Sequence, residues 1–554
     1  VGEVRGAEAY VLFQGMASIV GDEEIFVVKD GKPLRVKIKD LNNVKDCYAF
    51  SYNLEKKKVE FIPVSAVVRH PKRRVLYKVT TKSGREITLT PDHSVFKFNN
   101  GIISAPMEEL TIGDKIMIPA RIPCGYADLE SINLLEFLPN IRVYAPKLVK
   151  EAVAKVGYEP ASVLCDVRSV SDYYSNFKRS KPSSLRAAQF TSLMDRANLN
   201  YDLSELSVKF NKNSGSLPAK LHLTNEFLRF LGYYLSEGTI GKNNESMAFY
   251  NKDERILNDM RHCITKVTGK IPRERITDRG WGSATELSFN HRVIYEFLNK
   301  YFGRKQEKRI PDFIFGLSKE KIGQFLSALY DGDGHFGKKQ FCYYTTAKKL
   351  ADDMSKLLLT LGIVCRIRTR NVIGRKTTDY HLSIYRTEDK LELLKFVKPI
   401  KIKDLKYPPS ANRTNIVGDL YIDQIKSIEK INLDRGEYVY DLVVPGTRNF
   451  IGGFGGVLLH NSGHAGFGTM HAENVNTMIK RLESPPINLS PSLVETLDAV
   501  CVMTQARVKD KVVRKVSEVS EIVGVSEELG RANINTPFKW DPRSDTFMFK
   551  RDSK

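Results

Sequence analysis

The stretch that decides the fold is VYDLVVPGTRNFIGGFGGVLLHNS, residues 439–462, which ends in His460, Asn461 and Ser462. Its β-branched and aromatic residues, interrupted by Pro and Gly, predict paired strands. If residues 18–461 are deleted, the upstream FQGMA runs directly into SGHAGFGTMHAEN, and the joined sequence reads as one continuous protein. The chain is therefore predicted to carry a removable insert.

The residues at the two edges of the insert suit an exchange of peptide bonds. The hydroxyl of Ser18 can take over the acyl group of Ala17 as an ester, which other nucleophiles can attack. Ser462 can then accept that acyl group. The side-chain amide of Asn461 can attack its own carbonyl to form a cyclic imide, with His460 as the proton donor. This set predicts excision with joining of the flanks.

Two further segments of the insert carry candidate helper residues. GREITLTPDHSVFKF places Thr90 and His93 in a T-x-x-H arrangement on a predicted strand that leads into a turn. Such a pair can polarise and protonate the amide that breaks. Asp441 lies in the strand-like segment that precedes the downstream edge.

The segments SIVGDEEIFVV, TPDH, YDLVVPGTRNF and LLHN followed by Ser resemble, in this order, the splicing blocks of inteins. The resemblance implies the all-β horseshoe of the Hint domain, which hedgehog autoprocessing proteins share. It also implies the roles of the site residues: Ser18 as first nucleophile, Thr90 and His93 as activators, Asp441 as helper, His460 as penultimate residue, Asn461 as cyclising residue and Ser462 as final acceptor.

The upstream edge has two possible registers. Ser18 is preferred because it places Gly21-Asp22 at the distance usual for inteins. Some inteins begin with Ala and omit the first ester, in which case Ala17 is the first residue and Ser462 attacks directly. Arg448 departs from the pattern, since inteins often have His there. A hedgehog-type processor is less favoured because it lacks the His-Asn end.

Two apolar runs inside the insert each end in an acidic residue and Gly: FLGYYLSEG at 230–238 and LSALYDGDG at 326–334. Their small residues would let two helices pack closely and bring Glu237 and Asp333 together, where two carboxylates can hold Mg²⁺. The segment that begins at Asn251 is matched about 95 residues later, so the sequence predicts a duplicated pseudo-twofold α/β body.

These features resemble the LAGLIDADG homing endonucleases that many inteins carry, over about residues 221–397. The resemblance implies a site-specific nuclease with Mg²⁺ as cofactor and Glu237 and Asp333 as metal ligands. It makes Lys308, in EKRIPDFIF, the lysine of the catalytic site. The implied partner is double-stranded DNA, namely the host gene without the insert, and the insert itself is expected to be monomeric.

The charge of the chain favours a nucleic-acid partner. The formal net charge is +21, and the two flanks hold as many acidic as basic residues, so the whole excess lies in the insert. The stretch CRIRTRNVIGRK predicts a basic strand face that reads a DNA groove, and a solvated sheet face is the alternative. The candidate DNA-binding residues are Arg366, Arg368, Arg370, Arg375 and Lys376.

The joined flanks, with GE followed by R, then GH and MHAEN, resemble the secretion ATPases of the type II and type IV pilus class. The resemblance implies a RecA-like α/β fold and a homo-oligomeric, hexameric host that uses ATP and Mg²⁺. Glu3 would be the catalytic carboxylate, Arg5 would lie near it, and His471 would belong to the histidine motif. Because neither flank has a phosphate-binding loop, the chain is expected to be a host fragment that cannot hydrolyse ATP alone.

The predicted fold class is therefore α+β multidomain, with an inserted endonuclease in a Hint horseshoe between ATPase fragments. Seven cysteines without a C-x-x-C pair favour reduced thiols and a cytoplasmic location. Two alternatives stay open: a plain P-loop secretion ATPase with a basic insertion, and a splicing element whose nuclease binds DNA without cutting it. The predicted segments are 1–17 (host), 18–122 (Hint), 123–220 (linker or DNA recognition), 221–400 (endonuclease), 401–461 (Hint) and 462–554 (host).

Overall fold

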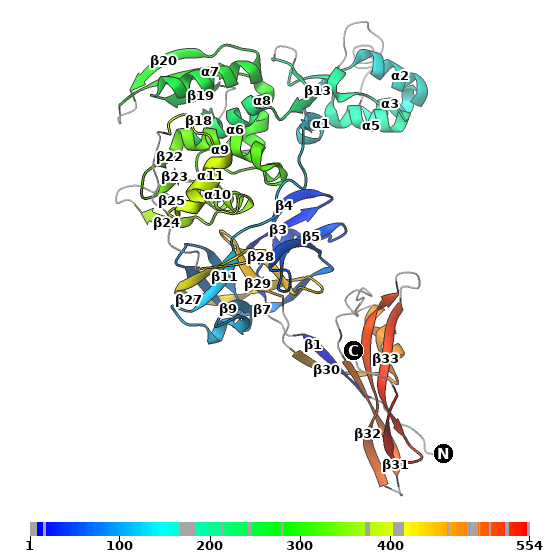
Figure 1. Cartoon of the computed structure of the whole chain (residues 1–554). Helices are drawn as coiled ribbons and strands as arrows, with labels where there is room; N and C mark the ends of the chain where they lie inside the picture. Colours follow the sequence, from blue (N-terminus) through cyan, green and yellow to red (C-terminus); the bar gives the residue numbers. More distant parts are fainter. Residues whose placement is uncertain are drawn as a thin grey trace.

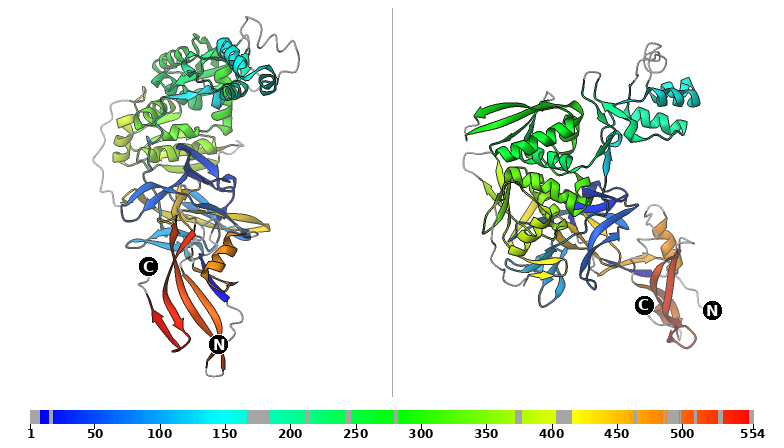
Figure 2. Two further views of the ribbon diagram at one scale, coloured as in Figure 1. Left: turned by 90° about the vertical axis from the view of Figure 1, so that its right-hand side faces the viewer. Right: turned by 45° about the horizontal axis from the view of Figure 1, so that its top comes forward.

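The chain is a mixed α+β protein of several bodies, as predicted (Figure 1). The views of Figures 1 and 2 agree that a β-rich body lies between a helix-and-sheet body and a separate long sheet. None of the described helices is long and apolar enough to cross a membrane. The computed structural model describes residues 8–14, 18–166, 184–211, 214–241, 246–278, 282–371, 377–402, 415–461, 465–484, 487, 497, 499–508, 511–526 and 531–550.

The β-rich body, called the splicing domain below, is one continuous sheet built from both ends of the insert. Its main order is β2-β8-β7-β27-β11-β9-β29-β28-β3-β5-β6, with β4, β10 and β26 at its margins. Alternating apolar residues such as Ile25, Val27 and Leu442 fill its core. The strands are β2 Ile19–Val20, β3 Glu24–Lys29, β4 Lys32–Lys37, β5 Cys47–Asn53, β6 Lys58–Pro63, β7 Ala66–Thr81, β8 Glu86–Leu89, β9 Ser94–Phe98, β10 Ile102–Pro106, β11 Lys115–Pro119, β26 Ile416–Val417, β27 Leu420–Val443, β28 Asn449–Gly452 and β29 Val457–His460.

The helix-and-sheet body, called the nuclease domain below, contains the same unit twice. One sheet has the order β18-β19-β21-β20 and the other β22-β23-β25-β24, and each follows a long helix. The repeat in the sequence predicted this duplication. The first unit is α6 Asn225–Glu237, β18 Gly238–Ile240, β19 Ser246–Asn251, α7 Glu254–Thr268, β20 Arg273–Asp278, β21 Ser283–Asn290 and α8 Arg292–Tyr301; the second is α9 Lys319–Asp333, β22 Gly334–Phe336, β23 Phe341–Thr345, α10 Lys348–Thr360, β24 Arg366–Asn371, β25 Thr378–Ile384 and α11 Thr387–Phe396.

Helices α6 and α9 pack at unusually short range. A Cβ atom at Gly232 of α6 would lie 2.4 Å from the carbonyl oxygen of Phe325 in α9. A Cβ atom at Gly332 would lie 2.3 Å from the hydroxyl of Ser236. The glycines therefore set how closely the two helix ends approach each other.

Residues between the splicing and nuclease domains form a folded body of their own, and not an extended spacer. A sheet of order β14-β13-β15-β16 packs against helices around the buried Val143, Phe190 and Val208. This region contains β12 Ser131–Asn133, α1 Leu134–Phe137, β13 Arg142–Tyr144, α2 Pro146–Val156, α3 Tyr158–Leu164, β14 Ser184–Arg186, α5 Ala187–Ala197, β15 Ser207–Lys209, β16 Leu217–Pro218 and β17 Lys220–His222.

The described flanks do not show the expected RecA-like α/β arrangement. They form an antiparallel sheet of order β30-β1-β31-β32-β33-β34, which α12 covers with Val475 and Met478. Parallel strands need long crossovers, whereas two to four residues separate β31, β32, β33 and β34 and enforce antiparallel pairing. The elements are β1 Glu8–Gln14, β30 Ala465–His471, α12 Val475–Glu483, β31 Ala499–Val508, β32 Lys511–Ser526, β33 Arg531–Asp541 and β34 Thr546–Phe549.

Candidate splicing site and candidate nuclease site

The loop that carries Thr90 and His93 lies between the two ends of the insert. Upstream of the loop, Leu89 of β8 pairs with Ile19 of β2, directly after Ser18. Downstream of it, Val95 of β9 pairs with Leu459 of β29. One short loop therefore touches the strand that begins the insert and the strand that ends it.

Ser18 is fully buried and is held on both sides by Thr90. The amide of Ser18 donates to the hydroxyl of Thr90 at 3.1 Å. The amide of Thr90 donates to the carbonyl oxygen of Ser18 at 2.9 Å. The bond from the Ser18 nitrogen to the preceding residue is thus next to a hydroxyl group that can exchange a proton with this nitrogen.

His93 and Asp441 surround the same site. The amide of His93 donates to the carbonyl of Thr90 at 3.1 Å, and the His93 side chain is completely buried. On β27, Tyr440 pairs with Ile19, so the antiparallel register places the buried Asp441 opposite Ser18. The structure thus brings together four of the residues that the sequence singled out, namely Ser18, Thr90, His93 and Asp441.

The downstream end is fixed by the β28–β29 hairpin. The amide of Asn461 donates to the carbonyl of Arg448 at 2.9 Å, and its side chain is buried. His460 pairs with Asn449, and its ring lies 5.3 Å from the ring of Phe96 on the neighbouring strand β9. Ala17 and Ser462 lie outside the described residues.

Glu237 and Asp333 end the two helices that pack together, as the sequence predicted. A Cβ atom on Gly332 would lie 2.8 Å from Cγ of Glu237, which shows how close the two helix ends are. Burial and the nearby Asp333 raise the pKa of Glu237 to about 8. Burial also raises the pKa of Asp333. Asn251 of β19, which sequence reasoning missed, donates to Glu237 at 2.9 Å.

Two lysines lie beside these acids. Nζ of Lys308 donates to the carbonyl oxygens of Tyr234, Leu235 and Gly238, at 2.9, 2.8 and 2.8 Å. Nζ of Lys401 donates to the carbonyl oxygen of the residue before Asp333, at 2.9 Å. Burial lowers the pKa of both lysines. Sequence reasoning missed Lys401, although a lysine after α11 matches the position of Lys308 after α8 in the repeat.

The chemistry of this donor set fits a hard divalent cation. Two half-buried carboxylates with raised pKa values lie near each other, and the repulsion of Glu237 by Asp333 would be relieved by a cation. Carboxylate oxygens are the ligands that Mg²⁺ prefers. Glu237 and Asp333 are therefore the residues that would hold the ion.

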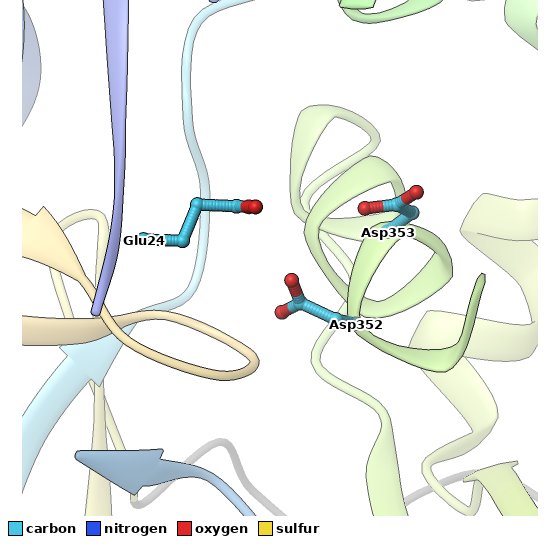
Figure 3. Close-up of side chains that lie close together, drawn as sticks. All are labelled: Glu24, Asp352 and Asp353. Carbon is cyan, nitrogen blue, oxygen red and sulfur yellow. The ribbon is translucent and has the colours of Figure 1, made fainter. Parts of the chain in front are cut away.

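A second acidic cluster is a charge network and does not have the character of a metal site. Figure 3 shows Glu24 of β3 pointing toward Asp352 and Asp353 of α10. The ammonium group of Lys349 lies 2.6 Å from Glu24 and 2.9 Å from Asp353, and that of Lys356 lies 3.0 Å from Asp352. Burial opposes ionisation of Asp352, but the two lysines outweigh it and lower its pKa. Side-chain cations already neutralise these acids.

The candidate DNA-binding residues lie on an edge strand. Arg366, Arg368 and Arg370 are exposed on β24, while Ile367 between them is buried against the splicing domain and donates its amide to Ser83 at 2.7 Å. On the flanks, His471 is exposed at the end of β30, and its carbonyl accepts from Arg481. The remaining predicted residues, Arg375, Lys376, Glu3 and Arg5, lie outside the described part of the chain.

The comparisons agree with the geometry of the first site. The family model described as intein splicing domain matches residues 26–461, which is most of the chain. The chain belongs to this family. The splicing-block resemblance is thereby confirmed, together with its all-β fold.

The chain is similar to a DNA polymerase of Thermococcus aggregans, at 26% identity over 524 residues, which covers 76% of this chain and 27% of that protein. It is also similar to the DNA-directed RNA polymerase subunit Rpo1C of Methanocaldococcus jannaschii, at 25% identity, which covers 75% of this chain and 50% of that protein. The chain thus spans half or less of the length of these relatives.

Two solved structures are similar to parts of the chain. The Ssp DnaB mini-intein variant M86 matches with 30% identity and a TM-score of 0.18, over 20% of this chain and 64% of that chain. Mesophilic variants of the homing endonuclease I-DmoI match with 16% identity and a TM-score of 0.25, over 32% of this chain and 96% of that chain.

Proposed function

We propose that residues 18–461 excise themselves and join the two flanks by an amide bond. The observation that supports this proposal is the position of Thr90, which bonds to both sides of Ser18 from a loop that also reaches the strand ending at His460. Such a site holds the reacting groups in place, and this positioning compensates for the weak nucleophilicity of the serine hydroxyl groups.

The first exchange takes place at Ser18. Its hydroxyl oxygen bonds to the carbonyl carbon of Ala17, the bond from that carbon to the Ser18 nitrogen breaks, and the proton passes to this nitrogen. Thr90 and the buried His93 are the groups that carry the proton and polarise the bond. The Ser462 hydroxyl then bonds to the same carbon, and the oxygen of Ser18 leaves with a proton.

The second exchange releases the insert. The side-chain nitrogen of Asn461 bonds to its own carbonyl carbon, and the peptide bond to Ser462 breaks. His460, half-buried against Phe96, delivers the proton to the departing nitrogen. The free amine of Ser462 finally displaces its own side-chain oxygen from the acyl carbon, which restores an amide between Ala17 and Ser462.

Mass spectrometry of the expressed chain tests this function. The unmutated chain should yield the free insert and a joined product of residues 1–17 and 462–554. Asn461→Ala should give no joined product, whereas Asn99→Ala, in an exposed turn, should splice normally. An unprocessed, correctly folded chain from the unmutated sequence would favour the secretion ATPase with a basic insertion.

We propose a second function for the insert, the cutting of double-stranded DNA by the nuclease domain. Glu237 and Asp333 would hold Mg²⁺, which supplies charge stabilisation at the scissile phosphate. Lys308 and Lys401, half-buried beside the acids, would contact the phosphate or orient the attacking water. The exposed arginines of β24 and the folded body around α5 would add contacts to the DNA backbone.

A plasmid that carries the uninterrupted coding sequence of the joined flanks is the substrate for the test. The released insert should cut it in the presence of Mg²⁺ and leave it intact with a chelator. Binding of the plasmid without cutting would favour the splicing element with an inactive nuclease.

The secretion ATPase host rests on the motifs of the flanks alone, and we keep it as a proposal. Sequencing the host gene upstream of the codon for Val1 tests it. The proposal requires a phosphate-binding loop there, because neither residues 1–17 nor residues 462–554 contain a G-x-x-x-x-G-K-[ST] sequence.

A further inference from the structure

The two units of the nuclease domain differ in the partner of one aspartate, which is half-buried in the first unit and buried in the second. In the first unit, Asp259 of α7 accepts a hydrogen bond at 2.7 Å from Nε of Arg229, which lies in α6. The repeat pairs Asp259 with Asp353 of α10, and the alignment of Glu237 with Asp333 pairs Arg229 with Phe325. The second unit therefore has a buried aspartate without the arginine that its counterpart uses.

The splicing domain supplies that arginine. Arg35 of β4 is 4% exposed and forms an ion pair with the completely buried Asp353. A buried carboxylate needs such a partner, because an unpaired buried charge is strongly destabilising. Lys349 also lies 2.9 Å from Asp353, so the carboxylate has a second cation in the same cluster.

Arg35 also contacts the segment that carries Lys308. Its Nη2 donates to the carbonyl oxygen of Ile310, and its Nε donates to Asp312 at 2.7 Å. The amide of Ile310 donates to Asp353 at 2.8 Å, so both backbone groups of Ile310 bond to this ion pair. The guanidinium also lies 4.2 Å from the centre of the Phe315 ring.

We propose that Arg35 is a positioning residue for DNA cleavage, through which the splicing domain fixes Lys308. The inference rests on the proposed nuclease function. A single residue separates Lys308 from Ile310, so a shift of this segment moves the lysine away from the carbonyl groups that end α6. The nuclease site is therefore complete only when the splicing domain is folded against it.

The test compares Arg35→Met, Arg35→Lys and the control Lys37→Met in the released insert. Lys37 lies on the same strand, is exposed and pairs with Asp22. We expect Arg35→Met to lower kcat on the plasmid at least about tenfold, with KM within about twofold, because small misplacements cost rate and not binding. Lys349 remains beside Asp353, so the variant is expected to fold.

Arg35→Lys separates positioning from charge. Lysine restores a cation beside Asp353 but cannot donate to Ile310, Asp312 and Asp353 together. We expect the melting temperature of Arg35→Lys to equal that of the unmutated insert, while its cleavage of the plasmid stays as slow as that of Arg35→Met. Full recovery of kcat by lysine, an unchanged kcat in Arg35→Met, or a loss confined to KM would each overturn the inference.

Amide hydrogen exchange gives a measurement that does not depend on cleavage. Arg35→Met should lose protection in the peptide covering residues 305–316, while α6 keeps its protection. If the unmutated insert does not cut DNA, the nuclease proposal fails. The exchange experiment still shows whether Arg35 fixes the segment that carries Lys308. Unchanged exchange in this peptide would overturn the role of Arg35 in either case.

Discussion

The splicing site and the nuclease site hold their reactive groups by different means. Ser18 directly precedes β2 and Asn461 directly follows β29, and backbone hydrogen bonds with Thr90 and Arg448 fix them. Glu237 and Asp333 lie at the ends of packed helices, in a group of buried charges that includes Lys308. The first site aligns hydroxyl and amide groups, whereas the second concentrates charge.

This difference follows from the chemistry proposed for each site. An acyl transfer between hydroxyl and amide groups needs short contacts along one path, which sheet register provides. A phosphodiester is already charged, so its cleavage needs compensating cations close together. Substitutions at one site should therefore leave the other reaction intact.

The largest expected effect is the loss of one carboxylate of the nuclease. Glu237→Gln or Asp333→Asn removes a ligand charge, and we expect plasmid cutting to fall by about a thousandfold, since each ~1.4 kcal/mol is worth a factor of ten. Splicing should proceed at the normal rate. Glu226→Gln, at the other end of α6, is the matched control. Normal cutting by Glu237→Gln would show that this acid does not take part in DNA cleavage.

Thr90→Val tests the splicing side of the comparison. Valine has nearly the shape of threonine but cannot accept the hydrogen bond from the Ser18 amide. We expect joining of the flanks to slow by about a hundredfold, the usual scale for one acid–base group, with plasmid cutting unchanged. Pulse-labelling followed by electrophoresis measures the rate. Thr111→Val, in an exposed turn, should splice like the unmutated chain.

The sequence predicted local chemistry better than contacts between domains. The order TPDH, YDLVVPGTRNF and LLHN predicted a site that the strand register indeed assembles, because splicing chemistry requires those residue types. The repeat predicted both acidic helix ends because a metal site requires carboxylates. Arg35, in contrast, lies in KPLRVK, whose pattern is that of any surface strand. Its partners Asp312 and Asp353 are distant in the chain, so sequence spacing could not reveal them.

The glycines of GGFGG show the same limit. A run of this kind, here at residues 452–456, is typical of a flexible turn when it is read from sequence alone. In the structure, the amide of Gly455 donates to Asp352 of α10 at 2.7 Å, and a Cβ atom there would lie 3.2 Å from Cδ1 of Ile367 in β24 of the nuclease domain. This glycine therefore permits a close approach between two domains, and only the packed structure shows the need for it.

Lys401→Met should have a smaller effect on the nuclease than loss of an acid. Lys308 remains beside Asp333, so one cation of the pair is kept. We expect kcat for plasmid cutting to fall by about tenfold, within the range of one general acid–base group. Lys398→Met, three residues away and exposed, should cut normally. Equal rates for the two variants would show that Lys401 does not take part.

The smallest expected effect tests whether the splicing domain also contains a titrating acid. Glu23, next to the charge network, accepts from the Thr88 amide at 2.8 Å, and burial raises its pKa to about 7. Between its ordinary pKa of about 4.5 and this value, the folded state binds more protons than the unfolded state. Its contribution to stability is therefore complete below this range and is lost as the pH rises through it.

Amide exchange of residues 86–90, corrected for intrinsic rates, should show weaker protection at pH 8 than at pH 5. Glu23→Gln keeps the hydrogen bond from Thr88 and should make protection independent of pH, while the exposed Glu108→Gln should behave like the unmutated chain. If Glu23→Gln retains the full pH dependence, another titrating group causes it, and Glu23 is not the acid that controls the protection of β8.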